Sequence, residues 1–274
     1  MPELPEAETI VRDLRARLPG STVARVQVTH ADVLHPGLTP AVLDRRLRGC
    51  TFTGVARRGK NVVLELDRGL RLVINLGMTG RVVTSDASRA GELRHVALRI
   101  ALVDGRAVLY DDARRFGDVD VRDEASWTAR DAQLGVEPLS DAFTAELLHA
   151  LTRVSIMPIR NWLLDQRRVA GVGNIYAVEA LFRAGIRPTR RARTLTRRET
   201  AALQNALQSV LQESIDARGT TISDYRDASG ERGNFERRLR VYDRAGEPCT
   251  SCGTEIRRVV LSNRSAFYCR RCQK

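Results

Sequence analysis

Four of the five cysteines lie within the last 26 residues, in the two pairs CTSC and CRRC. Cys249 and Cys252 form the first pair, Cys269 and Cys272 form the second, and 16 residues separate the pairs. This spacing predicts a tetrahedral zinc site of four thiolates, in which each pair binds from a tight turn and the intervening residues form a hairpin. Because four protein thiolates leave no open coordination position, we expect the zinc to be structural. A pair of redox dithiols is the alternative, although a catalytic CxxC usually occurs singly at a helix start.

Lysine is almost absent from this basic chain. Of the 45 basic residues only Lys60 and Lys274 are lysines, so arginine serves wherever a positive charge alone is needed. A lysine can do what a guanidinium cannot, since it can lose a proton and act as an amine. Lys60 is therefore a candidate for chemistry, and a place on a solvated turn is the alternative interpretation.

The chain opens with MPELPEAET, which holds two prolines and three glutamates. Pro5 suits the first turn of a helix, and the glutamates that follow it favour the positive end of that helix. Neither argument explains Pro2. If Met1 is removed, Pro2 becomes an N-terminal secondary amine, and α-amino groups have a pKa near 8 against about 10.4 for lysine. A useful fraction would then be the free base at neutral pH, which makes Pro2 a candidate nucleophile.

The charge balance favours an anionic partner. The 274 residues include 45 basic and 33 acidic side chains, which give a net charge of +12 and a pI near 10.4. Nucleic acid is favoured over membrane, because no apolar run approaches the roughly 18 residues that a membrane span needs. No signal-peptide pattern precedes the charged first helix, and the clustered cysteines do not resemble a disulfide framework, so we expect a cytoplasmic protein. The length allows two domains and a third, smaller module.

The first half of the chain alternates between apolar and polar residues. An amphipathic helix is expected over 5–18, and a short helix over 40–48 with Thr39 as its cap. Elsewhere the alternation predicts strands over 23–28, 51–56, 61–66, 70–76, 95–102 and 106–110. Residues 1–120 therefore predict a two-layer β-sandwich that carries an N-terminal helix.

From Ser126 the apolar residues recur at helical spacing. Helices are expected near 126–132, 141–152, 159–167, 174–184 and 196–217, with Ser140 and Thr196 as caps. Between the third and fourth of these, RRVAGVGN forms a glycine-containing turn into a helix start. Such a turn suits a phosphate, although it often only joins two packed helices. The polar, glycine-rich stretch 226–238 is expected to be a mobile loop.

Together these patterns predict an α+β protein of several domains. We expect the β-sandwich domain over 1–120, a helical domain over 121–235 and a zinc finger hairpin over 236–274. The hairpin segment RRVVLSNRSAFY is basic and aromatic, so Arg264 at its far end is a candidate for contact with a DNA groove or with phosphates. Cys50, outside the cluster, is expected to be a buried small apolar residue.

Several motifs occur in an order that resembles one enzyme family. They are MPELPEAET, RRGKNVVLEL, NLGMTG, DDARRFGD, LLDQRRVAGVGNIYAVEALFRAGIRP and the terminal cysteine hairpin. From residue 2 to its C-terminus the chain resembles the bacterial formamidopyrimidine-DNA glycosylases of the Fpg/Nei family. The resemblance implies a β-sandwich, a helical domain with a helix-two-turn-helix, and a zinc finger, in agreement with the patterns above. We expect a monomer that acts on damaged double-stranded DNA at the bacterial nucleoid.

The resemblance also implies a bifunctional repair enzyme. Such an enzyme excises oxidised purines, chiefly 8-oxoguanine and formamidopyrimidines, and then nicks the abasic site by β- and δ-elimination. Pro2 would attack C1′ to form a Schiff base, and Glu3 would protonate the opening sugar, with Glu6 as a helper. Lys60 would reach the damaged nucleotide and its phosphate. Arg264 would hold phosphates and protonate the second leaving group, and the first role is chemically easier because a guanidinium is a poor acid.

The DNA-binding positions follow from the same resemblance. Met78, Arg114 and Phe116 match residues that fill the gap left by a flipped nucleotide. There a methionine or phenylalanine can wedge between bases, and an arginine can pair with the orphaned cytosine. Core packing is the alternative for Met78 and Phe116. His95 and Asn174 resemble residues that contact the DNA backbone.

Two positions differ from the pattern of the family, and a third distinguishes between its types of enzyme. Arg160 stands where lysine is common and can still bind phosphate, whereas Ser155 replaces a basic residue of some members and is assigned no contact. Leu4 stands where the endonuclease VIII type, which acts on oxidised pyrimidines, usually has glycine, and this favours the purine enzyme. A non-catalytic zinc-ribbon DNA-binding protein is a further alternative, but such a protein would be expected to lack the candidate catalytic residues.

Overall fold

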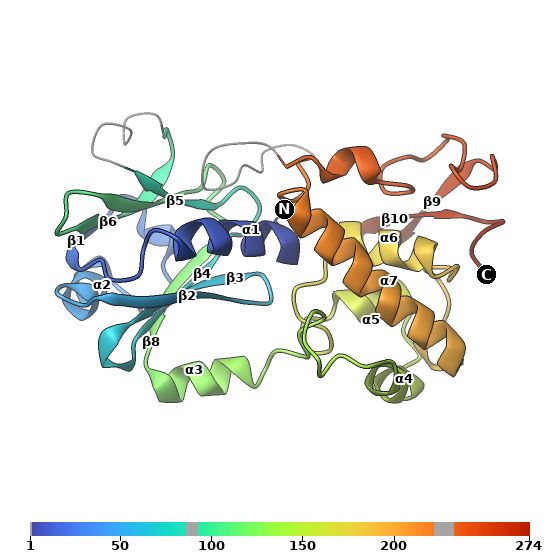
Figure 1. Cartoon of the computed structure of the whole chain (residues 1–274), viewed down its shortest axis with the longest axis horizontal. Helices are drawn as coiled ribbons and strands as arrows, with labels where there is room; N and C mark the ends of the chain where they lie inside the picture. The colour runs from blue at the N-terminus through green and yellow to red at the C-terminus, as the bar shows by residue number, and fades with distance from the viewer. Residues whose placement is uncertain (1, 86–92, 222–232) are drawn as a thin grey trace. The chain divides into compact units, whose positions relative to one another are not determined.

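The computed structural model describes residues 2–85, 93–221 and 233–274. The chain forms two compact units, which are described one at a time (Figure 1). The first unit comprises Met1–Ala132 with Ala217–Asn234, and the second comprises Gln133–Asp216 with Phe235–Lys274. No helix among the described residues is long and apolar enough to cross a membrane.

Two antiparallel four-stranded sheets form the first unit. One sheet has the strand order β1-β6-β7-β5 and the other the order β2-β3-β4-β8. The strands are β1 (Val23–Val28), β2 (Phe52–Arg58), β3 (Asn61–Leu66), β4 (Arg71–Asn75), β5 (Arg81–Ser85), β6 (Val96–Leu102), β7 (Ala107–Asp111) and β8 (Asp118–Arg122). The predicted two-layer sandwich is confirmed.

Helix α1 (Leu4–Arg15) connects the two sheets. It contacts β2 and β3 of one sheet and β5 of the other (Figure 1). Its buried apolar side chains recur at helical spacing and join one core with apolar side chains of both sheets. Burial of each such side chain contributes about 1.5–3 kcal/mol, so the start of the chain is held firmly against the sheets. The same unit holds α2 (Pro40–Leu47) and α3 (Glu124–Asp131).

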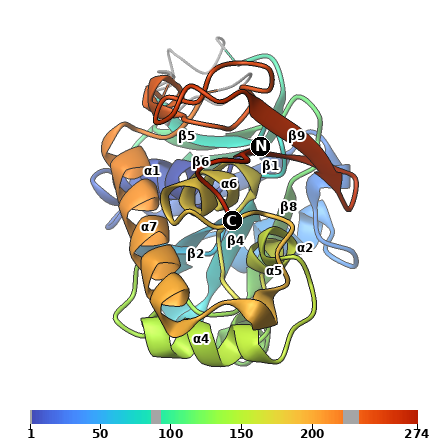
Figure 2. The ribbon, with the colours of Figure 1, turned by 90° about the vertical axis from the view of Figure 1, so that its right-hand side faces the viewer.

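The second unit is helical and ends in a hairpin. Its helices are α4 (Ala145–Arg153), α5 (Ile159–Leu164), α6 (Asn174–Arg183) and α7 (Arg197–Asp216). The long helix α7 packs against α4 and α6, and α5 packs against α6 (Figure 2). Strands β9 (Ile256–Leu261) and β10 (Arg264–Cys269) pair antiparallel, and β10 contacts α6. The hairpin is therefore built onto the helix that follows the RRVAGVGN turn.

Two strands were not evident from the sequence. β8 has the sequence DVDVR, in which three of five residues are charged, yet it pairs with β4 along its whole length and buries Val119 and Val121. β5 is a five-residue strand that directly follows a turn. Both strands depend on their sheet neighbours, which the local pattern does not report.

Two of the three predicted helix caps are confirmed. The Oγ1 atoms of Thr39 and Thr196 each accept a backbone N–H three residues on, at 3.3 Å. The prediction for Ser140 was wrong, because the chain turns there and Ser140 Oγ donates to the carbonyl of Glu137 at 2.8 Å. Thr144 caps α4 instead, and its Oγ1 accepts the N–H of Leu147 at 3.1 Å. The predicted loop 226–238 lies mostly outside the described residues, and Phe235–Arg238 at its end form a 3₁₀ turn.

Candidate active site and nucleic-acid interface

Pro2 and Glu3 lie at the start of α1, and both are buried. Glu3 precedes the helix and forms a reciprocal capping box with Glu6. The Glu3 carboxylate accepts the backbone N–H of Glu6, and Glu6 Oε2 accepts the N–H of Glu3 at 2.8 Å. The box satisfies two N–H groups of the first turn that have no partner within the helix. A carboxylate that is 2% exposed is thereby fixed beside Pro2.

Lys60 occupies the turn between β2 and β3. Gly59 and Lys60 form a two-residue turn between the last paired residues of these strands. Gly59 has a φ of 58°, which glycine adopts at little cost. Arg57, just before the turn, donates from Nε to Oε2 of Glu8 in α1 at 3.0 Å. The half-buried Lys60 is therefore carried on a hairpin that is tied to α1, the helix that directly follows Pro2 and Glu3.

Two loops carry the predicted gap-filling residues. Met78 is 36% exposed and Phe116 is 60% exposed, so neither packs in the core. The guanidinium of Arg114 lies over the ring of Phe116, 4.7 Å from its centroid, as in a cation–π contact. The first unit thus presents one thioether, one guanidinium and one phenyl ring to solvent from neighbouring turns.

His95 is exposed directly before β6, and its backbone is held by hydrogen bonds. Its N–H donates to Oδ1 of Asp111 at 2.8 Å, and its carbonyl accepts the N–H of Asp112 at 3.0 Å. The other oxygen of Asp111 accepts from Nε of Arg81 at 3.1 Å. These hydrogen bonds hold the backbone of His95 against the end of β7, while its imidazole is exposed.

Arg160 and Asn174 meet inside the second unit. Arg160 is 1% exposed, and its Nε and Nη2 donate to Oδ1 of Asn174, the first residue of α6, at 3.0 and 2.8 Å. The guanidinium also donates to Oδ1 of Asn161 and to the carbonyls of Leu261 and Ser265 in the hairpin. Asn174 Nδ2 donates to the same Ser265 carbonyl at 2.9 Å. One buried guanidinium therefore joins α5, α6 and the hairpin.

Arg264 is exposed at the tip of the hairpin. It is the first residue of β10 and pairs with Leu261 across a turn of Ser262 and Asn263. Both turn residues have positive φ, 45° and 62°, which is the backbone of the tight turn that matches the twist of a hairpin. The turn directs Arg264 outward from a strand whose other end carries Cys269.

The four clustered cysteines have the geometry of a metal site. Their sulfur atoms all lie within 4.8 Å of one another, with Cys249 and Cys272 at 3.9 Å and Cys252 and Cys269 at 3.5 Å. A tetrahedral zinc with Zn–S bonds of about 2.3 Å would set its sulfurs about 3.8 Å apart, so the four thiolates fit one zinc ion. The ion would be structural, since it would hold the ends of β9 and β10 with four protein ligands. The same sulfurs join an apolar cluster with α6 and the hairpin strands.

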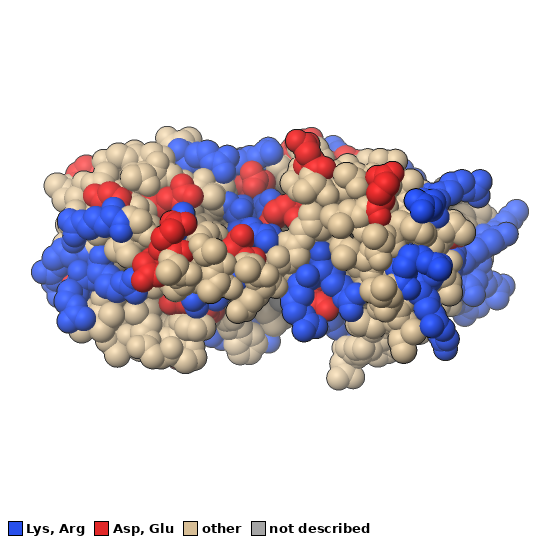
Figure 3. Space-filling view, turned by 90° about the horizontal axis from the view of Figure 1, so that it is seen from below, with Lys and Arg blue, Asp and Glu red and all other residues tan. Residues whose placement is uncertain are grey.

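Many basic side chains are exposed on the surface of the second unit. Figure 3 shows basic side chains at both ends of the face that it draws and between them. The exposed arginines of the second unit include Arg191, Arg193, Arg197, Arg198, Arg270 and Arg271.

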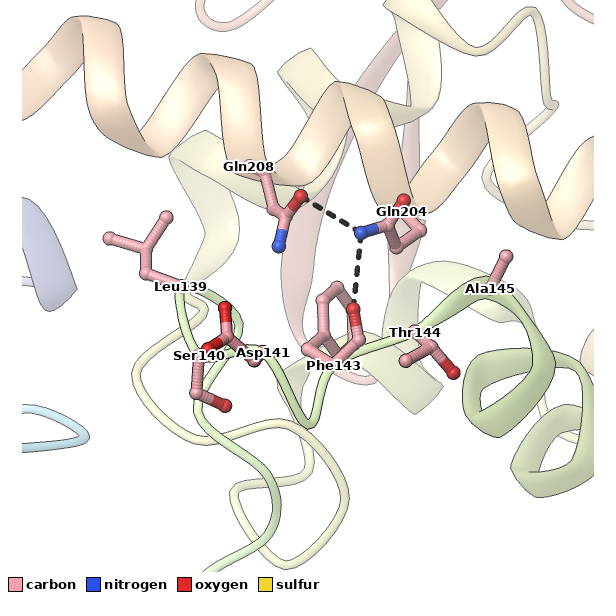
Figure 4. A pocket seen from close by; sticks show the side chains of 8 residues that line it. All are labelled: Leu139, Ser140, Asp141, Phe143, Thr144, Ala145, Gln204 and Gln208. Carbon is pink, nitrogen blue, oxygen red and sulfur yellow. Dashed lines mark hydrogen bonds between the residues drawn. The ribbon is translucent and has the colours of Figure 1, made fainter.

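A pocket of about 400 Å³ lies between α7 and the segment before α4 (Figure 4). Gln204 donates to Gln208 and to the carbonyl of Phe143 there, and the lining holds one carboxylate, that of Asp141. None of the predicted site residues lines this pocket, so the candidate chemistry lies elsewhere.

The predicted residues fall into two groups, one in each unit. The first unit holds Pro2, Glu3, Lys60, Met78, His95, Arg114 and Phe116, and the second holds Arg160, Asn174, Arg264 and the four cysteines. Asp111 and Asp112 were not among the residues predicted from the sequence, although both stand in the quoted DDARRFGD motif. Two adjacent aspartates directly after an apolar strand were the available signal, because buried carboxylates need several donors.

Three family models match consecutive parts of the chain. Residues 1–119 match the formamidopyrimidine-DNA glycosylase N-terminal domain, and residues 134–226 match the H2TH domain of the same enzymes. Residues 246–274 match the zinc finger found in FPG and IleRS. Formamidopyrimidine-DNA glycosylases of Chloroflexus aggregans and Rhizorhabdus wittichii are 41% and 44% identical over 100% of this chain and 98% and 100% of their own.

Solved structures give the same result. A complex of Lactococcus lactis Fpg with abasic-site DNA has a TM-score of 0.91 and 30% identity, and 99% of each chain is covered. A complex of the same enzyme with Fapy-dG DNA has a TM-score of 0.90 and 29% identity over 99% of this chain and 100% of that one. The MutM (Fpg) protein of Thermus thermophilus has a TM-score of 0.87 and 37% identity over 99% and 98% of the two chains.

Proposed function

The chain belongs to the formamidopyrimidine-DNA glycosylase family, and from that premise we propose that it is a bifunctional DNA glycosylase and AP lyase of base excision repair. The substrate is double-stranded DNA with an oxidised purine, either 8-oxoguanine or a formamidopyrimidine. Binding of Fapy-dG DNA by the Lactococcus relative supports the second of these. The observation that carries the proposal is the fixed pair of Pro2 and Glu3 at the buried start of α1.

The chemistry begins at Pro2 once Met1 has been removed. The secondary amine attacks C1′ of the damaged nucleotide, the glycosidic bond breaks, and the base leaves with a proton. Glu3 donates a proton to the ring oxygen as the sugar opens, and the nitrogen of Pro2 and C1′ are then joined as an iminium. Loss of the 3′ phosphate and then of the 5′ phosphate completes the nick. Glu6 assists because it holds the backbone of Glu3.

Lys60 and the DNA-binding residues place the nucleotide. The Lys60 ammonium contacts the phosphate of the damaged nucleotide, and His95 and Asn174 contact neighbouring phosphates. Arg264 at the hairpin tip holds a further phosphate, a role that its permanent charge suits. Arg160 belongs to the DNA-binding set through Asn174, whose side chain it holds.

Borohydride trapping tests the nucleophile. On a duplex with 8-oxoguanine opposite cytosine, the wild-type protein should become covalently linked to DNA, because borohydride reduces the iminium to a stable amine. A variant that carries extra residues before Pro2 has no amine there and should not be trapped. Pro2→Gly is the matched control, since glycine keeps an N-terminal amine and should still be trapped. Intact mass of the protein establishes whether Met1 is absent.

The same experiment separates the alternatives. Full trapping by the extended variant would refute Pro2 as the nucleophile. Lesion binding with neither excision nor trapping by the wild-type protein would favour a non-catalytic DNA-binding protein. Excision of oxidised pyrimidines in preference to 8-oxoguanine would favour the endonuclease VIII type of activity.

A further inference from the structure

The two loops that present Met78, Arg114 and Phe116 meet at one buried carboxylate. Asp112 is 1% exposed, and both of its oxygens accept two hydrogen bonds. Oδ1 accepts from Thr79 Oγ1 at 2.5 Å and from the backbone N–H of Arg114 at 3.3 Å. Oδ2 accepts from the hydroxyl of Tyr110 at 2.9 Å and from the backbone N–H of Gly117 at 3.0 Å. Asp112 therefore joins the turn after β4 to both ends of the 113–117 loop.

The backbones of these loops lie against each other. Gly77 has a φ of 60°, and a Cβ there would lie 2.5 Å from the carbonyl carbon of Phe116. A Cβ on Gly117 would lie 1.7 Å from the hydroxyl of Tyr110 and 2.6 Å from the carbonyl oxygen of Asn75. Only glycine permits these approaches, so both sides of the contact leave no room for a side chain. The exposed side chains of Met78, Arg114 and Phe116 therefore project from loops whose backbones are closely packed.

The site requires a carboxylate. Each oxygen of Asp112 faces one hydroxyl, which can rotate, and one backbone N–H, which cannot. An amide offers one oxygen and one NH₂ group, so in either orientation its NH₂ would face a backbone N–H. One is the N–H of Gly117, and the other is that of Arg114, which is shared with Thr79 Oγ1 at 3.0 Å. Burial and the neighbouring Asp112 carboxylate raise the pKa of Tyr110, so its hydroxyl keeps its proton and donates.

We propose that Asp112 is the positioning residue of the gap-filling side chains: it holds the Met78 turn and the Arg114–Phe116 loop in one fixed arrangement, ready to occupy the space that a flipped nucleotide leaves. The inference rests on the proposed function, because it assumes that these side chains enter DNA. Because Asp112 is 1% exposed, it would act through these loops rather than by contact with DNA. Its effect is entropic, since loops that are already ordered lose less conformational freedom when they insert.

The test uses a duplex that needs no chemistry. A tetrahydrofuran residue replaces the damaged nucleotide, and 2-aminopurine stands next to the orphaned base, where its fluorescence rises when a side chain disturbs its stacking. The wild-type protein should give a clear rise at saturating concentration. Asp112→Asn should lose most of this amplitude, and its excision of 8-oxoguanine should fall by about tenfold or more.

Trapping on a preformed abasic site separates this loss from failure of the chemistry. Because the Pro2 amine is untouched, trapping of Asp112→Asn should fall less than its excision. Asp44→Asn is the matched control: Asp44 accepts the N–H of Val26 at 2.7 Å and joins β1 to α2 in the same unit. It should change stability but leave the fluorescence amplitude as in the wild type.

Full amplitude and full excision in a folded Asp112→Asn protein would overturn the proposal. If that variant does not fold, Tyr110→Phe and Thr79→Val each remove one of the four donors and should reduce the amplitude in part. Wild-type amplitude in both of these variants would also overturn it. Absence of trapping by the wild-type protein would count against the proposed chemistry alone, since the fluorescence response does not depend on it.

Discussion

Glu6 Oε2 accepts the backbone N–H of Glu3 at 2.8 Å, and the other oxygen of the same carboxylate accepts the N–H of Thr220 at 2.8 Å. Glu6 is 1% exposed and lies in the first turn of α1. Thr220 follows α7, 214 positions along the chain. One side chain therefore fixes the backbone of the proposed general acid and the segment that returns to the first unit.

Glu6→Gln should impair catalysis without removing a reacting group. An amide would place its NH₂ against the N–H of Glu3 or that of Thr220, and a donor facing a donor costs about 1–3 kcal/mol. We expect kcat for 8-oxoguanine excision to fall by about tenfold, with a smaller change in KM. Glu124→Gln, at a 69% exposed side chain paired with Arg71, is the control and should leave kcat unchanged. Equal kcat in both variants would contradict a positioning role for Glu6.

The sequence predicted those features that depend on residues close together in the chain. The spacing of the cysteine pairs predicted the cluster, and period-two alternation predicted β1 and β3 at their observed bounds. Helix α1 was predicted to reach residue 18 but ends at Arg15, and in the turn that follows the carbonyl of Leu14 accepts the N–H groups of both Arg17 and Leu18. The residue at which a helix ends depends on the hydrogen bonds of its last turn, and a periodic pattern of apolar residues does not predict these bonds.

Long-range polar contacts were not predictable from the sequence. Arg160 was expected to bind phosphate, but its guanidinium lies among carbonyls of a hairpin about a hundred residues away in sequence. Asp112 and Glu6 likewise collect donors from segments that only the fold brings together. Composition and spacing identify the type of such a residue, whereas its partners are set by tertiary structure.

Lys60→Arg should separate charge from amine chemistry. The guanidinium keeps the positive charge, so DNA affinity should stay within about threefold, but its shape and its fixed protonation differ from those of an ammonium. We expect excision of 8-oxoguanine in single-turnover experiments to slow by about tenfold or more. Lys274→Arg is the matched control, because it changes the other lysine of the chain. Normal excision by Lys60→Arg would show that only the charge matters.

Cys249→Ser should remove the zinc and the DNA affinity together. A hydroxyl is a poor replacement for a thiolate, and loss of the ion frees the ends of the hairpin that carries Arg264. We expect bound zinc, measured by elemental analysis, to fall from one ion per chain to none, and DNA affinity to fall by about tenfold or more. Cys50→Ala is the control, since Cys50 is buried in the sandwich core and should leave the zinc content unchanged. Normal DNA binding by metal-free protein would contradict this role.

Arg160→Met should lower the free energy of unfolding but leave the salt dependence of DNA binding nearly unchanged. The substitution leaves the carbonyl of Leu261 and Oδ1 of Asn174 without their buried donor and removes one of the two side-chain donors to the carbonyl of Ser265, at a cost of about 3 kcal/mol in the free energy of unfolding. A direct phosphate contact would contribute about 0.9 to the slope of log K against log salt. We expect a slope within about 0.3 of the wild-type value. Arg191→Met, at an exposed arginine, is the control for stability, and a slope reduced by about one in Arg160→Met would instead indicate direct contact.

Asp165 should make the second unit sensitive to acid. Hydrogen bonds from the Arg167 side chain, together with those from its backbone N–H and from Arg168, lower the pKa of Asp165 from 3.8 to about 2. A lowered folded-state pKa contributes stability that is complete above about pH 5 and is lost as the pH falls through 3.8 towards 2. Because the Arg167 side chain is 80% exposed, solvent screening reduces the contribution to about 1 kcal/mol.

Asp165→Asn should therefore be less stable than the wild type by about 1 kcal/mol at pH 6, and the difference should vanish near pH 2. Urea unfolding followed by the fluorescence of Trp162 reports on this unit, because Trp162 is fully buried beside Arg168. A Trp127→Phe background removes the other tryptophan. Asp141→Asn, at an exposed carboxylate, is the control and should follow the wild-type curve. Parallel curves for Asp165→Asn and the wild type between pH 6 and pH 2 would show that the contacts of Asp165 with Arg167 and Arg168 do not stabilise the fold.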